Sequence, residues 1–353
     1  MSIRCKGLQK CKGLHRTLRE ETITIQNVAE LAGVSVATVS RVINGIQNVR
    51  NDTKEKVLAA MEELNYSPNA SARNLRKQES KAVLVLTPNF SNPFHSHILD
   101  GISERAQMLG YSALIVPYKT EENAEMQMKD MIDSKKADGA ILLASGRTEK
   151  WLKKYEKDYC IVQCAEYSEQ VTRVPHVSIN NYKAMFQMTK YLQSLGHKEI
   201  AIVLNDNKFV STNLRLDGYL DAMKENGIVD CERLIYRGKN YNFETGIEAI
   251  NDLMNREIKP TAVMCISDIL ALGVINGANS MGLQVPDELS VTGFDDVDYT
   301  KMIHPYLTTI KQPCYDLGTR SMDLLYNKLQ GINCESEVYL SYELKIREST
   351  SQI

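Results

Sequence analysis

Two short helical patterns that meet at a glycine, within residues 24–44, restrict this chain more than any other feature. Thr24 can act as an N-cap, and the apolar residues that follow recur at helical spacing: Val28, Ala29 and Leu31. Gly33 suits a turn, because glycine adopts a positive φ at the least cost. The pattern predicts a first helix with one apolar face that ends in a tight turn.

A second helix is predicted directly after the turn. Ser35 can cap it, and Val39 and Val42 point inward at three-residue spacing. The side chains left on the outer surface lie near the helix N-terminus: Val36, Ala37, Ser40 and Arg41. Helices of this shape present such side chains to base edges in the major groove of DNA. The sequence therefore favours a helix-turn-helix over a helical hairpin that binds nothing.

A third helix is expected to begin at Asp52 or Thr53, with an apolar face made by Val57, Met61 and Leu64. Ser67-Pro68-Asn69 then interrupts the chain, since proline ends one element and asparagine can cap the next. The restart over residues 70–76 is too short to be a stable helix alone. It exposes one large apolar side chain, that of Leu75.

With these motifs, residues 24–77 resemble the DNA-binding head of the lactose/galactose-repressor family of bacterial transcription regulators. The matching elements are Val28-Ala29, Ala32-Gly33-Val34-Ser35, Thr38-Val39-Ser40-Arg41-Val42, Asn65-Tyr66-Ser67-Pro68-Asn69-Ala70, Ala72-Arg73 and Leu75. The resemblance implies that the segment after Pro68 is a hinge helix that folds on the operator, with Leu75 wedged into the minor groove, where it bends the duplex.

The same resemblance implies which residues touch DNA. They are Thr24, Ser35, Val36, Ala37, Thr38, Ser40, Arg41, Asn44, Asn69, Ala72, Arg73 and Leu75. One head covers only a half-site, so a homodimer is expected to bind a double-stranded operator that is a pseudo-palindrome. A net charge of −2 does not by itself indicate nucleic-acid binding, but what matters is where the cations lie.

A chain of 353 residues is expected to hold more than one domain. We expect a helix-turn-helix domain over residues 24–68, a hinge helix and linker over 69–79, and a two-lobed effector-binding and dimerisation domain over 80–353. Residues 1–23 are basic and contain no apolar run long enough for a secretory signal. They are expected to be a disordered leader, with a basic arm that touches DNA as the alternative.

The eight cysteines are scattered along the chain without any C-x-x-C pair, which favours buried free thiols over zinc ligands or disulfides. The longest apolar runs, such as residues 82–86 and 139–144, are far too short to cross a bilayer. We therefore expect a cytoplasmic protein that has no membrane partner.

From Lys81 onward, short apolar runs alternate with amphipathic stretches. The runs cover residues 82–86, 113–116, 139–143, 160–164, 200–204, 261–266 and 289–293. The helical stretches cover roughly residues 97–109, 121–134, 182–195, 214–226, 244–254, 268–281 and 315–329. This alternation predicts an α/β body of parallel, Rossmann-like sheets covered on both faces. Two such lobes, divided near Ile179 and rejoined near residues 308–312, would enclose a cleft.

The motifs of common enzymes are missing: the sequence has no Walker A loop, G-x-G-x-x-G, H-E-x-x-H or G-x-S-x-G. His95 and His97 do not share one helical face, and Asp295-Asp296-x-Asp298 lacks the loop glycine and distal glutamate of a calcium loop. We therefore expect no catalytic residues, no metal and no cofactor. Asp295 is better placed in a ligand site after a strand, with a solvated acidic turn as the alternative for Asp296 and Asp298.

The body resembles the two-lobed, periplasmic-binding-protein-like effector domain of the same family. The resemblance carries over a set of residues that would hold a small-molecule effector: Phe94, His95, Ser211, Arg215, Tyr241, Ser267 and Asp295. An arginine and a carboxylate beside an aromatic ring suit a polyhydroxylated ring. The alternatives are a lobe-surface ion pair for Arg215 and a surface strand-end tyrosine for Tyr241.

Within the family, the body is most similar to the cytidine-responsive branch, through Arg73-Asn74, Glu79-Ser80, Pro175-His176-Val177 and Phe294-Asp295-Asp296-Val297-Asp298. Phe209 stands where the purine-binding member has a second arginine, which disfavours a purine base. The resemblance implies a repressor whose operator affinity is controlled by a sugar or nucleoside. The alternatives are a sugar-binding protein and a cytosolic enzyme of sugar metabolism.

Overall fold

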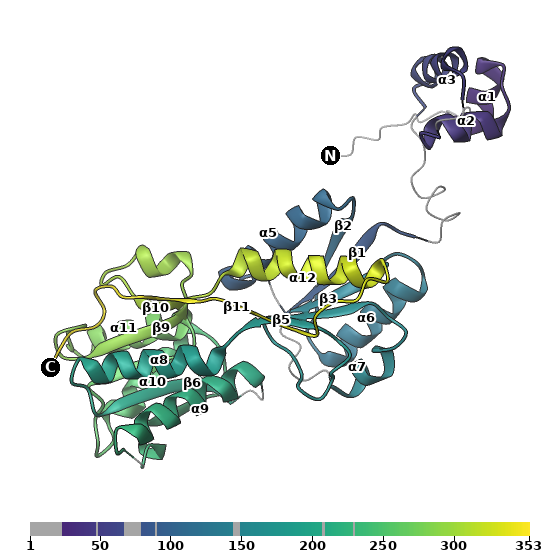
Figure 1. Cartoon of the computed structure of the whole chain (residues 1–353). Helices are drawn as coiled ribbons and strands as arrows, with labels where there is room; N and C mark the ends of the chain where they lie inside the picture. Colours follow the sequence, from purple (N-terminus) through teal and green to yellow (C-terminus); the bar gives the residue numbers. More distant parts are fainter. Residues whose placement is uncertain are drawn as a thin grey trace, which may run out of the picture. The chain divides into compact units, whose positions relative to one another are not determined.

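The computed structural model describes residues 23–46, 49–66, 79–88, 90–143, 149–206, 209–228 and 230–353. The chain divides into two compact units, Met1–Lys77 and Gln78–Ile353 (Figure 1). We call the first unit the head and the second unit the body. In the part of the chain that the structure describes, no helix is long and apolar enough to cross a membrane.

In its described residues, the head contains the helices α1 (Ile25–Ala32), α2 (Val36–Ile43) and α3 (Asn51–Glu63). Their shared core includes Val28, Val39 and Val57, none of which has any exposed surface. The turn after α1 is made by Gly33 with a φ of 65°, as the sequence predicted. The expectation that Leu31 lies on the buried face was wrong, since 46% of its surface is exposed. A short helix packed against two others buries only a narrow stripe, and Leu31 falls outside it.

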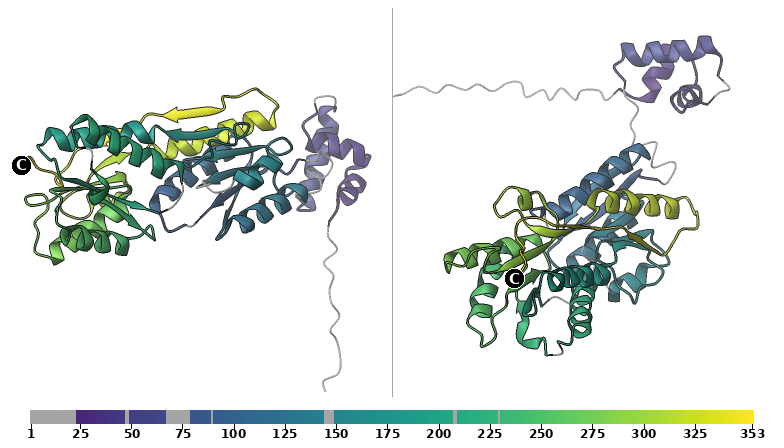
Figure 2. Two further views of the ribbon diagram at one scale, coloured as in Figure 1. Left: turned by 90° about the horizontal axis from the view of Figure 1, so that it is seen from below. Right: turned by 60° about the vertical axis from the view of Figure 1, so that its left-hand side comes forward.

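The body has two lobes, each built on a six-stranded sheet covered by helices on both faces (Figures 1 and 2). The first lobe contains β1 (Ala82–Thr87), α5 (Pro93–Met108), β2 (Ser112–Pro117), α6 (Glu121–Asp133), β3 (Gly139–Leu143), α7 (Glu149–Tyr155), β4 (Ile161–Cys164), β5 (His176–Ile179), α12 (Cys314–Leu329) and β11 (Glu337–Leu340). Its strand order is β11-β5-β4-β3-β1-β2, with every pairing parallel.

The second lobe repeats this plan. It contains α8 (Asn181–Ser194), β6 (Ile200–Asn205), α9 (Val210–Glu225), η1 (Glu232–Leu234), β7 (Ile235–Gly238), α10 (Phe243–Met254), β8 (Ala262–Cys265), α11 (Asp268–Ser280), β9 (Ser290–Asp295), η2 (Asp298–Lys301), β10 (Thr308–Lys311) and β12 (Glu343–Lys345). The order is β12-β10-β9-β8-β6-β7, and only β12 runs antiparallel to its neighbour. The predicted parallel α/β body is therefore confirmed, with one antiparallel edge strand added.

Strand β1 shows why these sequences fold into covered sheets. All six of its residues are buried. Val83 and Val85 pack with α5 and α12 on one face, while Leu84 and Leu86 pack with α6 and α7 on the other. Successive strand residues point to opposite faces, so an unbroken apolar run fits only a strand that has helices on both sides.

The chain passes between the lobes at three places: after β5, after β10, and between β11 and β12. The crossings after β5 and after β10 lie where the sequence predicted them, near Ile179 and near residues 308–312. The third was not predicted, because β11 and β12 are short edge strands with half-exposed residues. The six described cysteines are free thiols, and three of them are buried: Cys164, Cys231 and Cys265.

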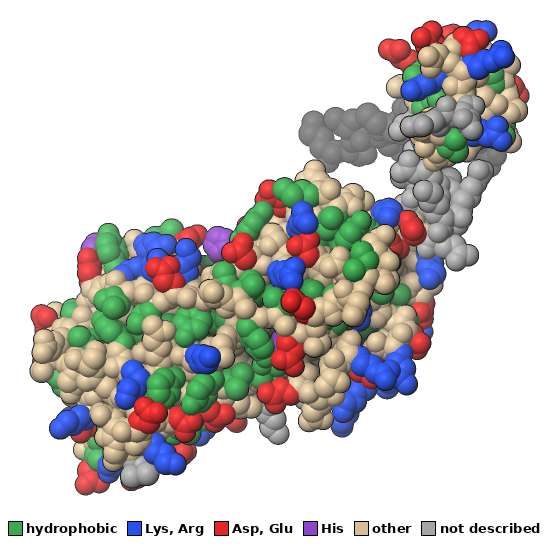
Figure 3. Space-filling view, in the orientation of Figure 1, with side chains coloured by type: hydrophobic (Ala, Val, Ile, Leu, Met, Phe, Trp, Pro, Cys, Tyr) green, Lys and Arg blue, Asp and Glu red, His purple; other side chains and the backbone are tan. Residues whose placement is uncertain are grey.

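Figure 3 shows one face of the molecule. Over the body on this face, lysine and arginine side chains are interspersed with aspartate and glutamate side chains. This mixture agrees with the near-neutral net charge of −2. Apart from a group of basic side chains at the lower right of the body in this view, the described charges of the two signs thus lie close together on this face.

Candidate functional site

In the head, α2 presents the side chains that the sequence selected for reading DNA. Ala37 and Arg41 are exposed, and Val36 exposes 37% of its surface, while Thr38 and Ser40 are partly buried. Val39 and Val42 face the core, as expected. The outer surface of α2 is therefore short, mixed in polarity and close to a helix N-terminus.

Both ends of this helix-turn-helix are fixed by side-chain hydrogen bonds. The hydroxyl of Ser35 accepts the backbone N–H of Thr38 at 3.2 Å, which caps α2. Asn44 follows α2 and donates from its side-chain amide to the carbonyl of Ser40 at 2.7 Å. Thr24 precedes α1, and its backbone N–H donates to the side-chain oxygen of Asn27 at 2.9 Å. Four further residues predicted to contact DNA lie outside the described residues: Asn69, Ala72, Arg73 and Leu75.

The body holds a cavity of about 1030 Å³ at the carboxyl ends of strands from both sheets. Its walls include residues that follow β1, β2, β4, β6, β7, β8, β9 and β10 in sequence. In open α/β sheets, ligands bind at this edge. Six of the seven residues assigned to the effector site line this one cavity: Phe94, His95, Ser211, Arg215, Tyr241 and Asp295.

Arg215 is built into the cavity wall rather than the lobe surface, since only 6% of its surface is exposed. Its Nε donates to the side-chain oxygen of Asn181 at 2.9 Å, and its Nη1 donates to the carbonyl of Ile266 at 2.5 Å. The guanidinium carbon lies 3.6 Å from the centre of the Phe294 ring. The cation is thereby held in one orientation by neutral groups and an aromatic face.

Asp295 ends β9 with a φ of 118°, a conformation that costs a non-glycine residue free energy and points to a functional constraint. It is 6% exposed, and the side-chain amide of Gln312 donates to its Oδ1 at 2.8 Å. Burial raises the pKa of Asp295 to about 7, although the charge of Arg215 and the Gln312 hydrogen bond lower it. Above about pH 7 the group is therefore ionised and can accept hydrogen bonds from a ligand, whereas at lower pH the neutral acid can also donate one.

Aromatic side chains complete the cavity on both sides. Phe94 follows Pro93 at the start of α5, where the side chain of Asn92 accepts its backbone N–H at 3.0 Å. Tyr241 comes just before α10, and its hydroxyl donates to the carbonyl of Ile266 at 3.2 Å, beside the Arg215 contact. Tyr241 is 37% exposed, so its ring is available on the cavity side while its hydroxyl is held.

Ser267 is placed differently from the other six residues. It is 1% exposed, caps α11 through the backbone N–H of Leu270, and is not among the residues that line the cavity. Its neighbour Asp268 does line the cavity wall and has no exposed surface. Asp268 accepts the hydroxyl of Thr309 at 2.6 Å and the backbone N–H of Val297 at 2.9 Å. It therefore holds the loop that follows Asp295.

Glu166 is a cavity residue that the sequence reasoning missed. It follows β4 in the first lobe and is half-buried. Its carboxylate accepts the hydroxyl of Ser211 and, at 3.3 Å, the Ser211 backbone N–H, so it bridges to the N-terminus of α9 in the second lobe. Burial raises its pKa, opposed by the Ser211 hydrogen bonds and the charge of Arg215. Its position after an apolar run was the signal that could have found it.

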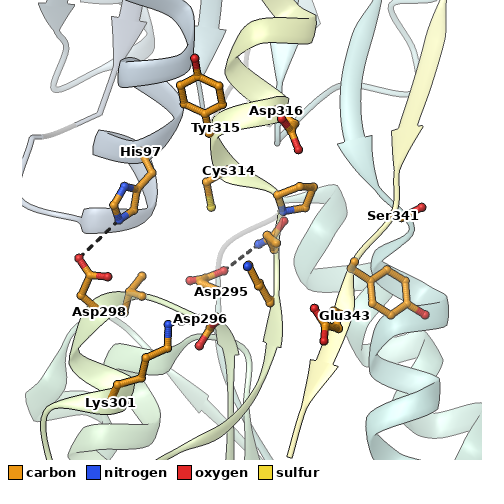
Figure 4. Close-up of a pocket in the computed structure, with 15 residues that line it drawn as sticks. His97, Asp295, Asp296, Asp298, Lys301, Cys314, Tyr315, Asp316, Ser341 and Glu343 are labelled. Atoms are coloured by element: carbon orange, nitrogen blue, oxygen red, sulfur yellow. Dashed lines mark hydrogen bonds and ion pairs between the residues drawn. The ribbon is translucent and has the colours of Figure 1, made fainter.

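A second cavity, of about 670 Å³, shares Asp295, Val297 and Gln312 with the first (Figure 4). In it, His97 of α5 faces Asp298 across the lobes, with 3.7 Å between Nε2 and Oδ2. The acidic-turn alternative for Asp296 was wrong, because its side chain is 2% exposed and paired with Arg347 at 2.5 Å. Among the described residues, no cluster of three or more potential metal ligands occurs.

Comparison with known proteins matches both units. Residues 24–69 match the family described as "Bacterial regulatory proteins, lacI family", and residues 189–350 match "Periplasmic binding protein-like domain". Catabolite control protein A of Priestia megaterium is 35% identical over 330 residues, which is 93% of this chain and 99% of that protein. The HTH-type transcriptional repressor CytR of Escherichia coli strain K12 is 36% identical over 334 residues, which is 94% of this chain and 97% of that protein.

A solved structure agrees over both units. The crystal structure of the Lac repressor dimer bound to operator and the anti-inducer ONPF aligns with a TM-score of 0.85 and 28% identity, covering 94% of this chain and 100% of that one. The matches extend over both the head and the body. The head contains a helix-turn-helix, and the two-lobed body contains the cavity. The chain therefore belongs to the lacI family of bacterial regulatory proteins and is a DNA-binding transcription regulator.

Proposed function

We propose that this protein is a cytoplasmic repressor that binds a pseudo-palindromic operator as a homodimer and responds to a sugar or nucleoside bound between the lobes of the body. The observation that carries the proposal is the gathering of Arg215, Tyr241 and Asp295 on one cavity of about 1030 Å³ in a chain that also has an exposed α2. The Lac repressor dimer, which is similar over 94% of this chain, was solved with operator and a small ligand.

The cavity chemistry supports a polyhydroxylated ligand. A hydroxyl both donates and accepts hydrogen bonds, so it can accept from the Arg215 guanidinium and donate to the Asp295 carboxylate. The rings of Phe94 and Tyr241 can lie against the apolar C–H face of a sugar or the plane of a base. The volume, about 1030 Å³, is large enough for a ligand of nucleoside size.

Control of DNA binding requires a ligand that distinguishes two arrangements of the body. Phe94 and Glu166 belong to the first lobe, while Arg215 and Asp295 belong to the second. A ligand that contacts both sets favours the arrangement in which they are close together. The three chain segments that join the lobes allow the lobes to change their relative position as two bodies.

The proposal is tested with the full-length protein in two steps. Selection from random double-stranded DNA should enrich sites with two inverted half-sites. Adding D-ribose or each ribonucleoside should then identify a compound that stabilises the protein against heat and changes operator affinity by at least about fivefold. Enrichment of no sequence, or a stabilising ligand that leaves operator affinity unchanged, would contradict the proposed control.

Arg41 is the side chain on α2 best suited to a bidentate contact with guanine. Arg41→Ala should weaken operator binding by about 1–3 kcal/mol per half-site and relax the preference at one symmetric base pair. Fluorescence anisotropy with operator and with random DNA measures both effects. Lys54→Ala, which removes an exposed cation from α3, is the matched control and should not change base preference. An equal loss on both DNAs would instead make Arg41 a phosphate contact.

A further inference from the structure

Among the described residues that line the cavity of the body, acidic side chains outnumber basic ones. The lining carboxylates are Glu121, Glu122, Glu166, Glu244, Asp268 and Asp295, and the lining cations are Lys119 and Arg215. Lys119 is exposed, so solvent screens it. Among the described residues, Arg215 is therefore the buried cation of the cavity, and its charge acts on more than one carboxylate.

Arg215 is shared electrostatically between two acids from different lobes. Its charge lowers the pKa of both Glu166 and Asp295, while burial raises both and the charge of Glu166 raises that of Asp295 further. Among the described residues, none of the ion pairs within 4 Å involves Arg215. The guanidinium is close enough to be balanced by these acids, yet it donates to the neutral oxygens of Asn181 and Ile266.

The N-terminus of α9 is one of the helix N-termini that line this cavity, and it is the one next to Arg215 on the same helix. α9 is 16 residues long, and its first N–H groups and dipole favour negative charge. Glu166 already occupies that position, since its carboxylate accepts both the hydroxyl and the backbone N–H of Ser211. The protein thus supplies its own anion at the point where a phosphate would be stabilised.

We propose that the cavity selects an uncharged polyhydroxylated ligand and rejects the phosphorylated form of the same compound, with Glu166 as the specificity-determining residue. This inference rests on the proposed function and narrows the ligand class. A hydroxyl matches the cavity because it can accept from Arg215 and donate to Asp295 or Glu166. A phosphate dianion only accepts hydrogen bonds and carries a charge of the same sign as the ionised forms of both acids. It therefore gains from Arg215 and is repelled by the two carboxylates once they are ionised.

Isothermal titration calorimetry of the full-length protein tests the selection directly. The probes are matched pairs, namely D-ribose and each ribonucleoside with the corresponding 5′-phosphate. In the unmodified protein, the member of a pair that binds should be the uncharged one, and its phosphate should bind at least about 100-fold more weakly, because like charges brought together in a buried site cost several kcal/mol. An ester that binds as tightly as its uncharged partner would overturn the proposal.

Glu166→Gln keeps the side-chain length and an oxygen that can accept from Ser211, but it removes the charge. The ratio of the affinity for the uncharged compound to the affinity for its phosphate should fall by about tenfold or more in this variant. Glu248→Gln makes the same chemical change on an exposed side chain of α10 that does not line the cavity, and it should leave this ratio unchanged. If this affinity ratio is the same in the parent protein and in both variants, Glu166 is not the residue that determines specificity.

The outcomes separate the inference from the function on which it rests. If a phosphate ester binds in the cavity and controls operator affinity, the proposed regulatory function is supported and the proposed selection against phosphates is wrong. If the uncharged compounds bind with the expected selectivity but operator affinity does not change, the selection stands and the proposed control is wrong. Failure of every uncharged compound to bind would overturn the selection, whatever the operator result.

Discussion

Replacing Asp295 with asparagine should remove the response to ligand and, in the same variant, stabilise the ligand-free protein above neutral pH. Asp295 is 6% exposed, and burial raises its pKa to about 7 from an ordinary value of 3.8. A folded-state pKa above the unfolded value means that ionisation opposes folding. The stability that the neutral acid contributes is fully present below about pH 4 and is lost as the pH rises through 7.

An asparagine at this position does not ionise, so the variant should avoid that loss. At pH 8 we expect it to unfold with a free energy roughly 2–4 kcal/mol higher than the parent protein, with the difference shrinking towards pH 5. Urea denaturation between pH 5 and pH 8 measures this. The same variant should lose the ligand-dependent thermal shift, because the two charged acceptor oxygens of the carboxylate are replaced by one neutral acceptor and an NH2 group that can only donate.

Asp298→Asn is the matched control for this prediction. It removes a carboxylate three positions along the same loop, but that side chain is 60% exposed and faces His97 in the second cavity. We expect its stability and its ligand response to stay close to those of the parent. A variant of Asp295 that is less stable than the parent at pH 8 would show that its ionised form is fully compensated in the folded protein.

The second large effect is expected where α10 and α11 touch through glycines. A Cβ added at Gly246 would lie 2.2 Å from the carbonyl oxygen of Leu270 and 2.8 Å from the Cα of Gly273. Both are backbone atoms, so the clash cannot be relieved by a side-chain rotation and the helices must separate. Gly246→Ala should therefore destabilise the body by about 3 kcal/mol, as measured by urea denaturation.

Gly227→Ala is a suitable comparison, because it adds the same methyl group without any atom within 4 Å. Its φ of 79° makes alanine unfavourable there, so a cost of about 1 kcal/mol is expected. If the two variants lose equal stability, close approach of the helices is not what requires glycine at position 246.

The sequence predicted the elements whose pattern is complete within a few residues. The apolar run of β1 and the cap at Ser35 are local features, and the structure places them accordingly. Helix α7 was missed because it is seven residues long and carries three lysines. Strand β11 was missed because it is an edge strand that pairs only with β5 and buries Val338 alone.

In the site, too, local sequence features placed some residues, whereas contacts between distant parts of the chain could not be predicted. Asp295 and Arg215 could be placed from the strand-end rule and from the family resemblance, and the structure brings both to the cavity. Glu166 also follows a strand, so the same rule could have placed it at the cavity, but its contact with Ser211 could not be predicted, because Ser211 lies in the other lobe, 45 residues along the chain. Ser267 was predicted from the family resemblance, whereas its neighbour Asp268 lines the cavity. The sequence could not separate the two, because packing decides which of two adjacent residues at a helix start reaches the cavity.

The path of the chain between the lobes has a consequence for synthesis on the ribosome. The face of the first sheet that carries Val83 and Val85 is covered by α5 and α12, but α12 begins only at Cys314. The second lobe is made in between, and at about 5–20 residues per second this takes roughly 10–30 s. During that time the first lobe lacks both a covering helix and the edge strand β11. The earliest part of the body to be translated is thus among the last to be completed, and the nascent chain needs protection from aggregation until its final segments emerge.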